Sequence, residues 1–405
     1  MSSSRLYYTD AYLTEFDAVV QDALEVGGRP AVTLDVSAFY PTSGGQPFDT
    51  GTLGDARVLE VVDLDDDRVA HVLDRALPSG VPVHGAIDWN RRFDHMQQHT
   101  GQHVLSAACD RICHAHTESF HLGADSSTID LAIAITADQA AAAEAEANRI
   151  VWEDRPVGVR FASADEARQL PLRKESLREG TLRLVDVEGF DLSACGGTHV
   201  ARSGGIGVIA VCGTERFKGG TRIEFVCGGR ALTRFRQQRD VLAAVTRQLS
   251  VVPAELAAAI ERLQSENKAQ RTLARSLQSQ LVGYEARTLT DAAESSGGRR
   301  LVVRRMEGFD AQGLKALAMA IVATPGCVAC LLNAETPPLV IVARSSDVAL
   351  DSAVVLRDLI DRFGGKGGGR PELAQGGGLT GEPDVILGAA RELIGRPTCG
   401  TQRAD

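Results

Sequence analysis

The sequence predicts a multidomain α+β protein: a small N-terminal β-barrel, an α+β domain, a helical or coiled-coil linker and a C-terminal α/β domain. Residues 1–88 carry short alternating apolar runs separated by Gly, Pro and Asp, which is typical of strands that close into a small barrel or a sandwich. Residues 89–230 mix helical and strand patterns. Residues 231–292 are helical and nearly free of Gly, and residues 293–405 alternate strands with helices.

The domain of residues 89–230 is expected to hold two helices and several strands. HMQQHTGQHVLSAACDRI has small or apolar residues at helical spacing, and DQAAAAEAEANRIVWED is rich in Ala and Glu, which favour helix. STIDLAIA predicts a strand. GIGVIAVCGTERFKGGTRIEFVCG predicts two strands joined through a Gly-Gly turn.

An apolar stripe runs along the linker of residues 231–292. Its residues repeat in alternating steps of four and three, as in a coiled coil, with polar interruptions at Asn267 and Gln270. Pro253 predicts the start of the second of two helices, because proline fits a first helical turn. A helical hairpin and a dimer seam would both bury the stripe, and the sequence does not choose between them. The stripe consists of Leu256, Ile260, Leu263, Asn267, Gln270, Ala274, Leu277, Leu281 and Tyr284.

In the C-terminal domain of residues 293–405, RLVVRRM, CVACLLNA and PLVIVARS predict strands, and helices are expected near residues 311–324 and 351–363. The segment GGKGGGRPELAQGGG is too rich in glycine for a regular element, so we expect a glycine-rich loop there.

Composition excludes several classes of protein. The 405 residues carry a net charge of −10, which argues against a protein that only coats nucleic acid, although local basic patches can still bind RNA. The first residues are not followed by the apolar stretch that a signal peptide has, and no run of about 18 apolar residues is present. We therefore expect a cytoplasmic protein without a membrane segment. Eight cysteines are too few for a disulfide scaffold, so most should be buried thiols.

Two distant pairs of side chains predict one zinc site. His99 and His103 are four residues apart, so on a helix they project from one face. In DLSACGGTHV, Cys195 and His199 are separated by two glycines, which favour a tight loop over a helix. Three imidazoles and a thiolate are ligands that Zn²⁺ accepts, whereas Mg²⁺ and Ca²⁺ prefer oxygen.

Other titratable residues have a less specific pattern. His95 lies one turn before His99 and is either an alternative ligand or a substrate contact. Cys327 and Cys330 form a CxxC motif, but they lie in an apolar run without a second ligand pair, so buried strand cysteines are expected. Cys109 and Cys113 fit one helix face of a core.

At this point the chain resembles a known family. HTGQH followed by CGGTH resembles the editing domain of alanyl-tRNA synthetases and the free-standing AlaX editing proteins. FYPTSGGQPFDTG, THVARSGGIG and GGTRIEFVCG are similar to other segments of that family, and GGKGGGRPELAQGGG is similar to its C-terminal domain. The similarity covers nearly the whole chain and matches the long AlaX form. About 88 residues precede the zinc helix and no class II synthetase signature is found, so we expect editing without aminoacylation.

The resemblance implies a function and a set of site residues. The implied substrate is tRNA(Ala) mischarged with serine, or with glycine, and the reaction is zinc-dependent hydrolysis of the aminoacyl ester, without ATP. One Zn²⁺ per chain would be held by His99, His103, Cys195 and His199. If all four stay bound, the ion orders the pocket and positions substrate; if one is loose, it activates water.

The remaining candidate residues would bind the reacting group or the RNA. Backbone N–H groups around Ser43, Gly44, Gly45 and Gln46 would stabilise an oxyanion, with a plain turn as the alternative. Thr117, Ser119 or Gln102 would bind the serine hydroxyl. The candidates for tRNA binding are Arg91, Arg92, Lys218, Arg222, Lys366 and Arg370.

Two other functions remain open: a non-catalytic tRNA-binding protein with a structural zinc site, and a zinc hydrolase of a small ester. A homodimer formed through the linker or the C-terminal domain is a further possibility.

Overall fold

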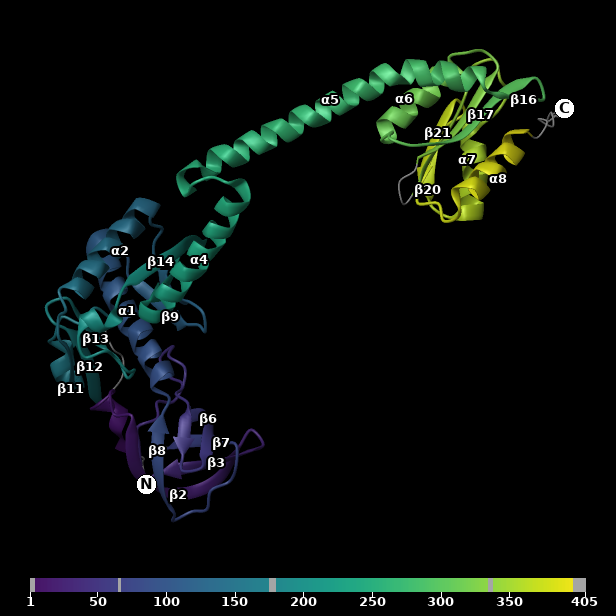
Figure 1. The fold of residues 1–405 in the computed structure, drawn as a ribbon. Coiled ribbons are helices and arrows are strands. Elements are labelled where there is room, and N and C mark those ends of the chain that lie inside the picture. The colour runs from purple at the N-terminus through teal and green to yellow at the C-terminus, as the bar shows by residue number, and fades with distance from the viewer. Residues whose placement is uncertain (1–3, 65–66, 175–179, 334–337, 396–405) are drawn as a thin grey trace, which may run out of the picture. The chain divides into compact units, whose positions relative to one another are not determined.

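The computed structural model describes residues 4–64, 67–174, 180–333 and 338–395 (Figure 1). Residue contacts divide the chain into two compact units, Met1–Val245 and Thr246–Asp405. The predicted barrel and the predicted α+β domain thus belong to the same unit. The finer division into four domains stays a prediction. The two ends of the chain, residues 1–3 and residues 396–405 with Cys399, lie outside the described residues.

The N-terminal part of the first unit is a closed barrel, which confirms the barrel and excludes the sandwich. Ala56 and Val58 on β6 point inward by alternation, and a bulge between Val58 and Glu60 turns Val61 inward as well. Phe39 and Leu53 complete the core. In barrel order, the strands are β2 (Glu15–Val26), β3 (Arg29–Leu34), β7 (Val69–Leu73), β6 (Ala56–Asp63), β5 (Gly51–Leu53) and β8 (Pro82–Ile87). Near them lie the short β1 (Ser4–Arg5), η1 (Leu6–Tyr8) and β4 (Val36–Ser37).

The predicted helix with the paired histidines is α1 (Trp89–Cys113), the central element of the first unit. Asp88 caps its N-terminus by accepting from the N–H of Arg91. Most of α1 is buried, because it packs on one side against α2 (Ala137–Trp152) and on another against a sheet. Gly101 lets the helix approach that sheet, since an added Cβ would lie 2.2 Å from Cys227 Sγ. The buried side chains of Cys109 and Cys113 confirm their prediction as core residues.

Two antiparallel sheets surround α1. The first has the order β14 (Ile209–Phe217), β15 (Gly220–Cys227), β10 (Ser127–Leu131), β9 (Thr117–Leu122). The second has the order β11 (Val157–Ser163), β12 (Thr181–Val187), β13 (Asp191–Ala194). The short α3 (Ala164–Arg168) and η2 (Ser203–Ile206) connect strands.

The turn between β14 and β15 differs by one residue from the predicted Gly-Gly turn. Lys218 and Gly219 form it, with φ of 47° and 88°, while Gly220 already pairs with Phe217. Two consecutive residues with positive φ suit a tight hairpin.

The predicted pair of linker helices is confirmed as α4 (Gly228–Leu249) and α5 (Leu256–Asp291), with η3 (Pro253–Glu255) directly before α5. Among the described residues of α5, Ala259 is buried near its start, and Val282 and Ala286 near its end join the core of the second unit. Leu256, the first residue of the predicted apolar stripe, is half-buried, and the rest of the stripe is exposed, from Ile260 at 40% to Tyr284 at 75%. No single helix of the described residues is long and apolar enough to cross a membrane, although α4 and α5 taken together reach that length and apolarity across their bend.

The second unit is built on a six-stranded sheet with the order β16-β17-β18-β19-β21-β20. The end of α5 and α6 (Ala311–Val322) cover one face, and α7 (Ser352–Phe363) and α8 (Pro383–Gly395) cover the other. The first four strands are β16 (Glu294–Ser296), β17 (Arg299–Met306), β18 (Cys327–Asn333) and β19 (Leu339–Arg344). Cys327 and Cys330 are buried on β18 and face different cores, which confirms the prediction of buried strand cysteines.

The predicted glycine-rich loop of the C-terminal domain is wrong. Its residues form a hairpin of β20 (Lys366–Arg370) and β21 (Leu373–Gly377) at the edge of the sheet. Close approach explains the glycines: an added Cβ at Gly367 would lie 2.5 Å from the Gln375 carbonyl oxygen, and one at Gly376 would lie 3.0 Å from Leu356 on α7. Backbone proximity, and not strand propensity, determines the residue type here.

Candidate metal centre

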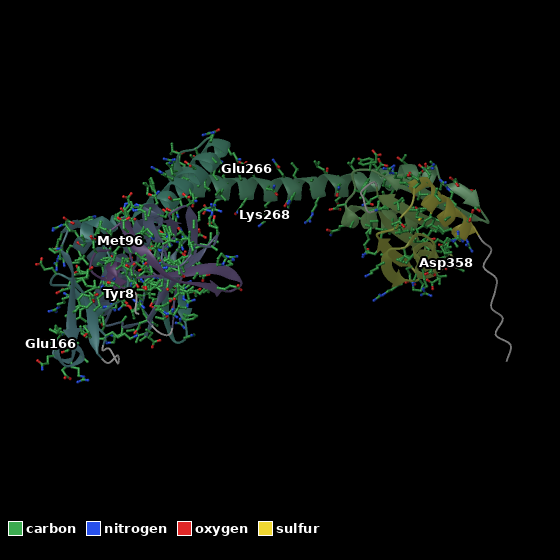
Figure 2. All side chains as sticks on the ribbon, turned by 90° about the horizontal axis from the view of Figure 1, so that it is seen from below. Tyr8, Met96, Glu166, Glu266, Lys268 and Asp358 are labelled. Atoms are coloured by element: carbon green, nitrogen blue, oxygen red, sulfur yellow. The ribbon has the colours of Figure 1, made fainter. Side chains whose placement is uncertain are left out.

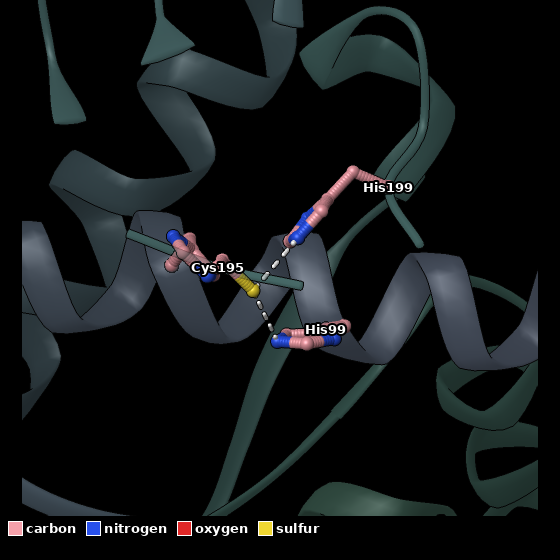
Figure 3. A group of neighbouring side chains, drawn as sticks. His99, Cys195 and His199 are labelled. Atoms are coloured by element: carbon pink, nitrogen blue, oxygen red, sulfur yellow. Dashed lines mark hydrogen bonds between the residues drawn. The ribbon is translucent and has the colours of Figure 1, made fainter. Parts of the chain in front are cut away.

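The structure brings all four predicted ligands together. His99 and His103 lie on α1, while Cys195 and His199 lie on the loop that follows β13. Their potential ligand atoms are all within 4.8 Å of one another, so the cluster can hold one metal ion. Cys195 Sγ is 3.3 Å from Nε2 of both His99 and His199. Dashed lines in Figure 3 mark these two contacts.

Each histidine of the cluster makes a hydrogen bond through Nδ1 to a buried acceptor. Such a bond fixes the tautomer and directs the lone pair of Nε2 toward the cluster. The acceptors come from three different parts of the fold. They are Gln46 Oε1 for His99 at 2.7 Å, Asp191 Oδ2 for His103 at 2.9 Å, and Thr100 Oγ1 for His199 at 3.2 Å.

The loop that carries Cys195 is held close to α1. An added Cβ at Gly197 would lie 2.2 Å from His99 Cε1, so the loop tolerates no larger residue there. Arg183 donates to the carbonyl oxygens of Cys195 and Gly197, at 2.7 and 2.9 Å. Gln46 accepts from the N–H of Thr198 and donates to its hydroxyl. Gly197 therefore serves close packing against a ligand, whereas an added Cβ at Gly196 would meet only Tyr8, at 3.7 Å.

The electrostatics favour a charged thiolate. Burial opposes ionisation of Cys195, but the nearby histidines outweigh it and lower the pKa of the thiol well below its ordinary value. Burial also acts to lower the pKa of His103, yet its hydrogen bonds to Asp191 and Cys195 prevail and raise that pKa to about 9. Burial would raise the pKa of Asp191, but its bonds to His103 and Arg173 bring it to about 2. One thiolate and three imidazole nitrogens are a donor set for a borderline transition metal, and not for Mg²⁺ or Ca²⁺.

A cavity of about 260 Å³ lies against the cluster. Its wall combines residues of the cluster with polar and charged groups that can bind an organic substrate. Among the residues that line it are His99, His103, Cys195, Gly44, Gln102, Thr117, Glu118, Ser119, Arg173 and Lys174.

The turn predicted to stabilise an oxyanion is only partly available. The N–H groups of Ser43 and Gln46 each donate to the carbonyl of the other, so the prediction of free backbone donors is wrong for Ser43 and Gln46. Its side chain is fully buried and serves His99 instead. Within the described residues, no hydrogen bond uses the N–H of Gly44 or Gly45, and Gly44 lines the cavity.

The predicted polar pocket residues lie together. Ser106 Oγ accepts from Gln102 Nε2 at 2.9 Å and from the Thr117 hydroxyl at 2.8 Å. Gln102 Oε1 and the oxygen of Thr117 therefore keep lone pairs for a ligand in the cavity. Ser119 instead donates to Asp130 at 2.6 Å.

The basic residues predicted to bind RNA differ in accessibility. Arg92 is fully buried and bound to Asp49, so that prediction is wrong for Arg92. Arg91 is half-buried and donates to the Phe48 carbonyl. Arg222 is paired with Asp130 and lies 3.6 Å over the Phe217 ring. Lys218, Lys366 and Arg370 are exposed.

Sequence reasoning missed several residues around the cluster. Asp191 and Thr100 lie inside the quoted motifs, but their role depends on the folded position of their histidines. Arg173 and Lys174 carried no signal in the sequence. His95 is buried and its Nδ1 has no partner among the described residues, yet it is not part of the cluster.

The fold and the cluster define a multidomain α+β protein with a buried site for one metal ion beside a cavity. Residues 182–224 match the family described as the threonyl and alanyl tRNA synthetase second additional domain. Over 402 residues the chain is 30% identical to the alanyl-tRNA editing protein AlaX-L of Pyrococcus horikoshii, covering 96% of this chain and 98% of that protein. The chain belongs to this family of alanyl-tRNA editing proteins, which is homologous to part of alanyl-tRNA synthetase.

The synthetase relatives are longer. The alanine–tRNA ligase of Methanoregula boonei is 33% identical over 406 residues, which cover 97% of this chain and 43% of the ligase. The chain thus spans less than half the length of such ligases. The solved C-Ala domain of Aquifex aeolicus alanyl-tRNA synthetase is 23% identical over 26% of this chain and 98% of that domain, with a TM-score of 0.24.

The partner of His103 should control metal affinity. We expect Asp191→Asn to weaken zinc binding by about 10- to 100-fold, because the neutral amide no longer supports the basicity of the imidazole. Competition with a chromophoric chelator measures the affinity, with the exposed Asp165→Asn as a matched control. An unchanged affinity in a natively folded Asp191→Asn protein would contradict a supporting role for this carboxylate.

Proposed function

We propose that the chain is a zinc-dependent hydrolase that deacylates mischarged tRNA(Ala), chiefly with serine and also with glycine. The observation that carries this proposal is the cavity against the four-ligand cluster, in a chain that belongs to an editing family. The substrate class comes from that family, since the relative from P. horikoshii is named an alanyl-tRNA editing protein.

Zinc fits the donor set better than other common ions do. His99, His103, Cys195 and His199 supply one thiolate and three nitrogens, which suits one tetrahedral Zn²⁺ per chain. When bound, the ion supplies positive charge and Lewis acidity at the floor of the cavity. Because all four ligands are preorganised by hydrogen bonds, we favour a role in positioning over one in activating water.

The chain's own groups would then support ester hydrolysis. Water attacks the carbonyl carbon, an oxyanion develops, and the ribose hydroxyl of the terminal adenosine leaves. Gly44 and Gly45 offer backbone N–H groups that no other described group uses, and Gly44 faces the cavity. Such preorganised donors stabilise an oxyanion without reorganisation.

Selectivity for serine would rest on the network around Ser106. With Ser106 accepting from both neighbours, Gln102 and Thr117 can accept a hydrogen bond from a serine hydroxyl. Alanine would leave these acceptors unpaired in a mostly buried site, which disfavours it relative to serine. Glycine also lacks the methyl group, so a water molecule can take that space and satisfy the same acceptors.

The RNA would be held outside the cavity by exposed cations. Lys218 on the β14–β15 turn, and Lys366 and Arg370 on β20, are free to contact phosphates. Arg91 and Arg222 would contribute less, because each is already engaged with protein groups.

The central test is deacylation of purified Ser-tRNA(Ala), Gly-tRNA(Ala) and Ala-tRNA(Ala). We expect release of serine and glycine but not alanine, loss of activity with a chelator, and recovery with Zn²⁺. Binding of tRNA without ester cleavage by metal-loaded protein would support the non-catalytic alternative. Cleavage of small esters irrespective of tRNA would support the other alternative.

The serine pocket makes a separate prediction. Thr117→Val keeps the shape but removes the hydroxyl, so kcat/KM for Ser-tRNA(Ala) should fall about tenfold or more, whereas Gly-tRNA(Ala) should be affected less. Thr214→Val, on the exposed part of β14, serves as the control. Equal losses for both substrates would remove Thr117 from the recognition of the hydroxyl.

We also propose that α5 forms a parallel coiled coil with a second copy of the chain. The exposed stripe has heptad phase, with Asn267 at an a position, which favours two strands in register. The same phase places Glu266 at g and Arg271 at e of the next heptad, where they attract each other across two parallel helices. Figure 2 shows Glu266 standing out from α5.

Light scattering of the purified protein tests this dimer. Leu263→Lys combined with Leu277→Lys should convert it to a monomer without loss of helix, because both side chains are already half exposed in one chain. Thr272→Lys, at an outward f position, should leave the dimer intact. A wild-type monomer at micromolar concentration would refute the proposal.

A further inference from the structure

Two cations, Arg173 and Lys174, line the cavity beside the metal cluster. They are consecutive residues, but their surroundings differ. The guanidinium of Arg173 donates to Asp191 Oδ1 at 2.7 Å and to Ser193 Oγ at 3.1 Å. Because Asp191 also binds His103, Arg173 is committed to the support of the ligand histidine and is not free for a substrate.

Lys174 is the available cation of this pair. Its side chain is exposed, and Nζ donates to the backbone carbonyl of Glu118 at 3.3 Å. No ion pair within the described ranges uses Lys174. An ammonium group has three N–H donors, so two of them remain for a ligand. The neighbouring Arg173 anchors the backbone, so this charge is held at the cavity while the flexible stem can still adjust.

One other charged pair at this end of the cavity is neutralised, whereas the carboxylate of Glu118 is exposed. Ser119 lines the cavity and binds Asp130, which in turn is held by Arg222. The bond from Arg222 keeps the pKa of Asp130 below its ordinary value, so both partners stay charged and mutually satisfied. Glu118 also lines the cavity; its backbone carbonyl accepts from Lys174, and no ion pair within the described ranges uses its carboxylate.

We propose that Lys174 binds the 5′-phosphate of the terminal nucleotide of the RNA, which makes it a substrate-positioning residue. This inference rests on the proposed function. With the aminoacyl ester beside the cluster, only the ribose separates the ester from that phosphate, which is the first anionic group of the chain. A lysine suits such a group, because it is a point charge on a flexible stem that needs no planar bidentate partner.

The phosphate contact has a consequence for specificity. A serine ester on a nucleotide would be held at two points, by the aminoacyl group in the cavity and by the phosphate at Lys174. An ester without the phosphate would be held at one. The enzyme would therefore favour the end of a nucleic acid over small seryl esters, even before the rest of the tRNA contributes.

Two matched small substrates test this directly: a seryl ester on the 3′-hydroxyl of adenosine, and the same ester on adenosine 5′-monophosphate. Wild-type protein should hydrolyse the phosphorylated ester with a kcat/KM higher by roughly 10- to 100-fold, the effect of a hydrogen bond to a charged group. Lys174→Met should abolish that preference by raising KM for the phosphorylated ester. Lys174→Arg should restore part of the preference.

Controls separate the possible failures. Lys315→Met, an exposed lysine of α6, should behave as wild type. With Ser-tRNA(Ala), Lys174→Met should reduce the slope of log kcat/KM against log salt by about 0.7, the loss of one single-strand phosphate contact. Equal losses on both small esters would indicate a structural role and overturn the proposal, as would no loss on either.

Binding provides a readout that does not need catalysis. Calorimetric titration with adenosine 5′-monophosphate and with adenosine should show a preference for the nucleotide that Lys174→Met removes. If wild-type protein hydrolyses no ester but shows this preference, the proposed function fails and the phosphate subsite stands. If it hydrolyses Ser-tRNA(Ala) without any preference for the phosphate, the subsite fails and the function stands.

Discussion

The structure depends on the hydrogen bonds that hold the three ligand imidazoles through Nδ1. A metal site of this kind needs four donor atoms aimed at one point, and free imidazoles would rotate away from it. The acceptors come from the loop after the first barrel strands, from α1 itself and from β13. The barrel is thus part of the metal centre, because Gln46 joins His99 to the loop of Cys195. This explains why both regions belong to one compact unit.

A second buried interaction fixes the same junction. Arg92 on α1 donates to Asp49 and to the carbonyls of Ala11 and Ala38, all from residues that precede the helix. Removing one partner of a buried ion pair strongly destabilises a protein, because the other charge is left buried without a counter-charge or solvent. The pair therefore specifies where the barrel sits on α1, and with it the position of Gln46. Assembly of the metal cluster and assembly of the domain are linked through one helix.

Local patterns in the sequence were sufficient to predict the four residues of the metal cluster and most of the elements that carry them. The four-residue spacing of His99 and His103 determines their common face on any helix, and the glycines beside Cys195 already indicated a loop. The burial of Arg92 was not predictable, because its partner lies 43 residues away in the chain and charge alone suggests solvent. The β20–β21 hairpin was missed because glycine disfavours strands, and only the approach of neighbouring backbone reverses that preference. The role of Lys174 could not be predicted either, because only the folded structure places this residue in the wall of the cavity.

The side chain of Gln46 has a thermodynamic consequence. It contacts His99 and Thr198 on one side and belongs to the barrel loop on the other, with no exposure to solvent. A ligand that binds only the folded state shifts the unfolding equilibrium toward that state. Metal binding and folding of the barrel are therefore coupled. A bound ion would stabilise the folded barrel, although the barrel contributes no atom to the coordination of the ion. A substitution that destabilises the barrel would, in turn, lower the affinity of the site for the metal ion.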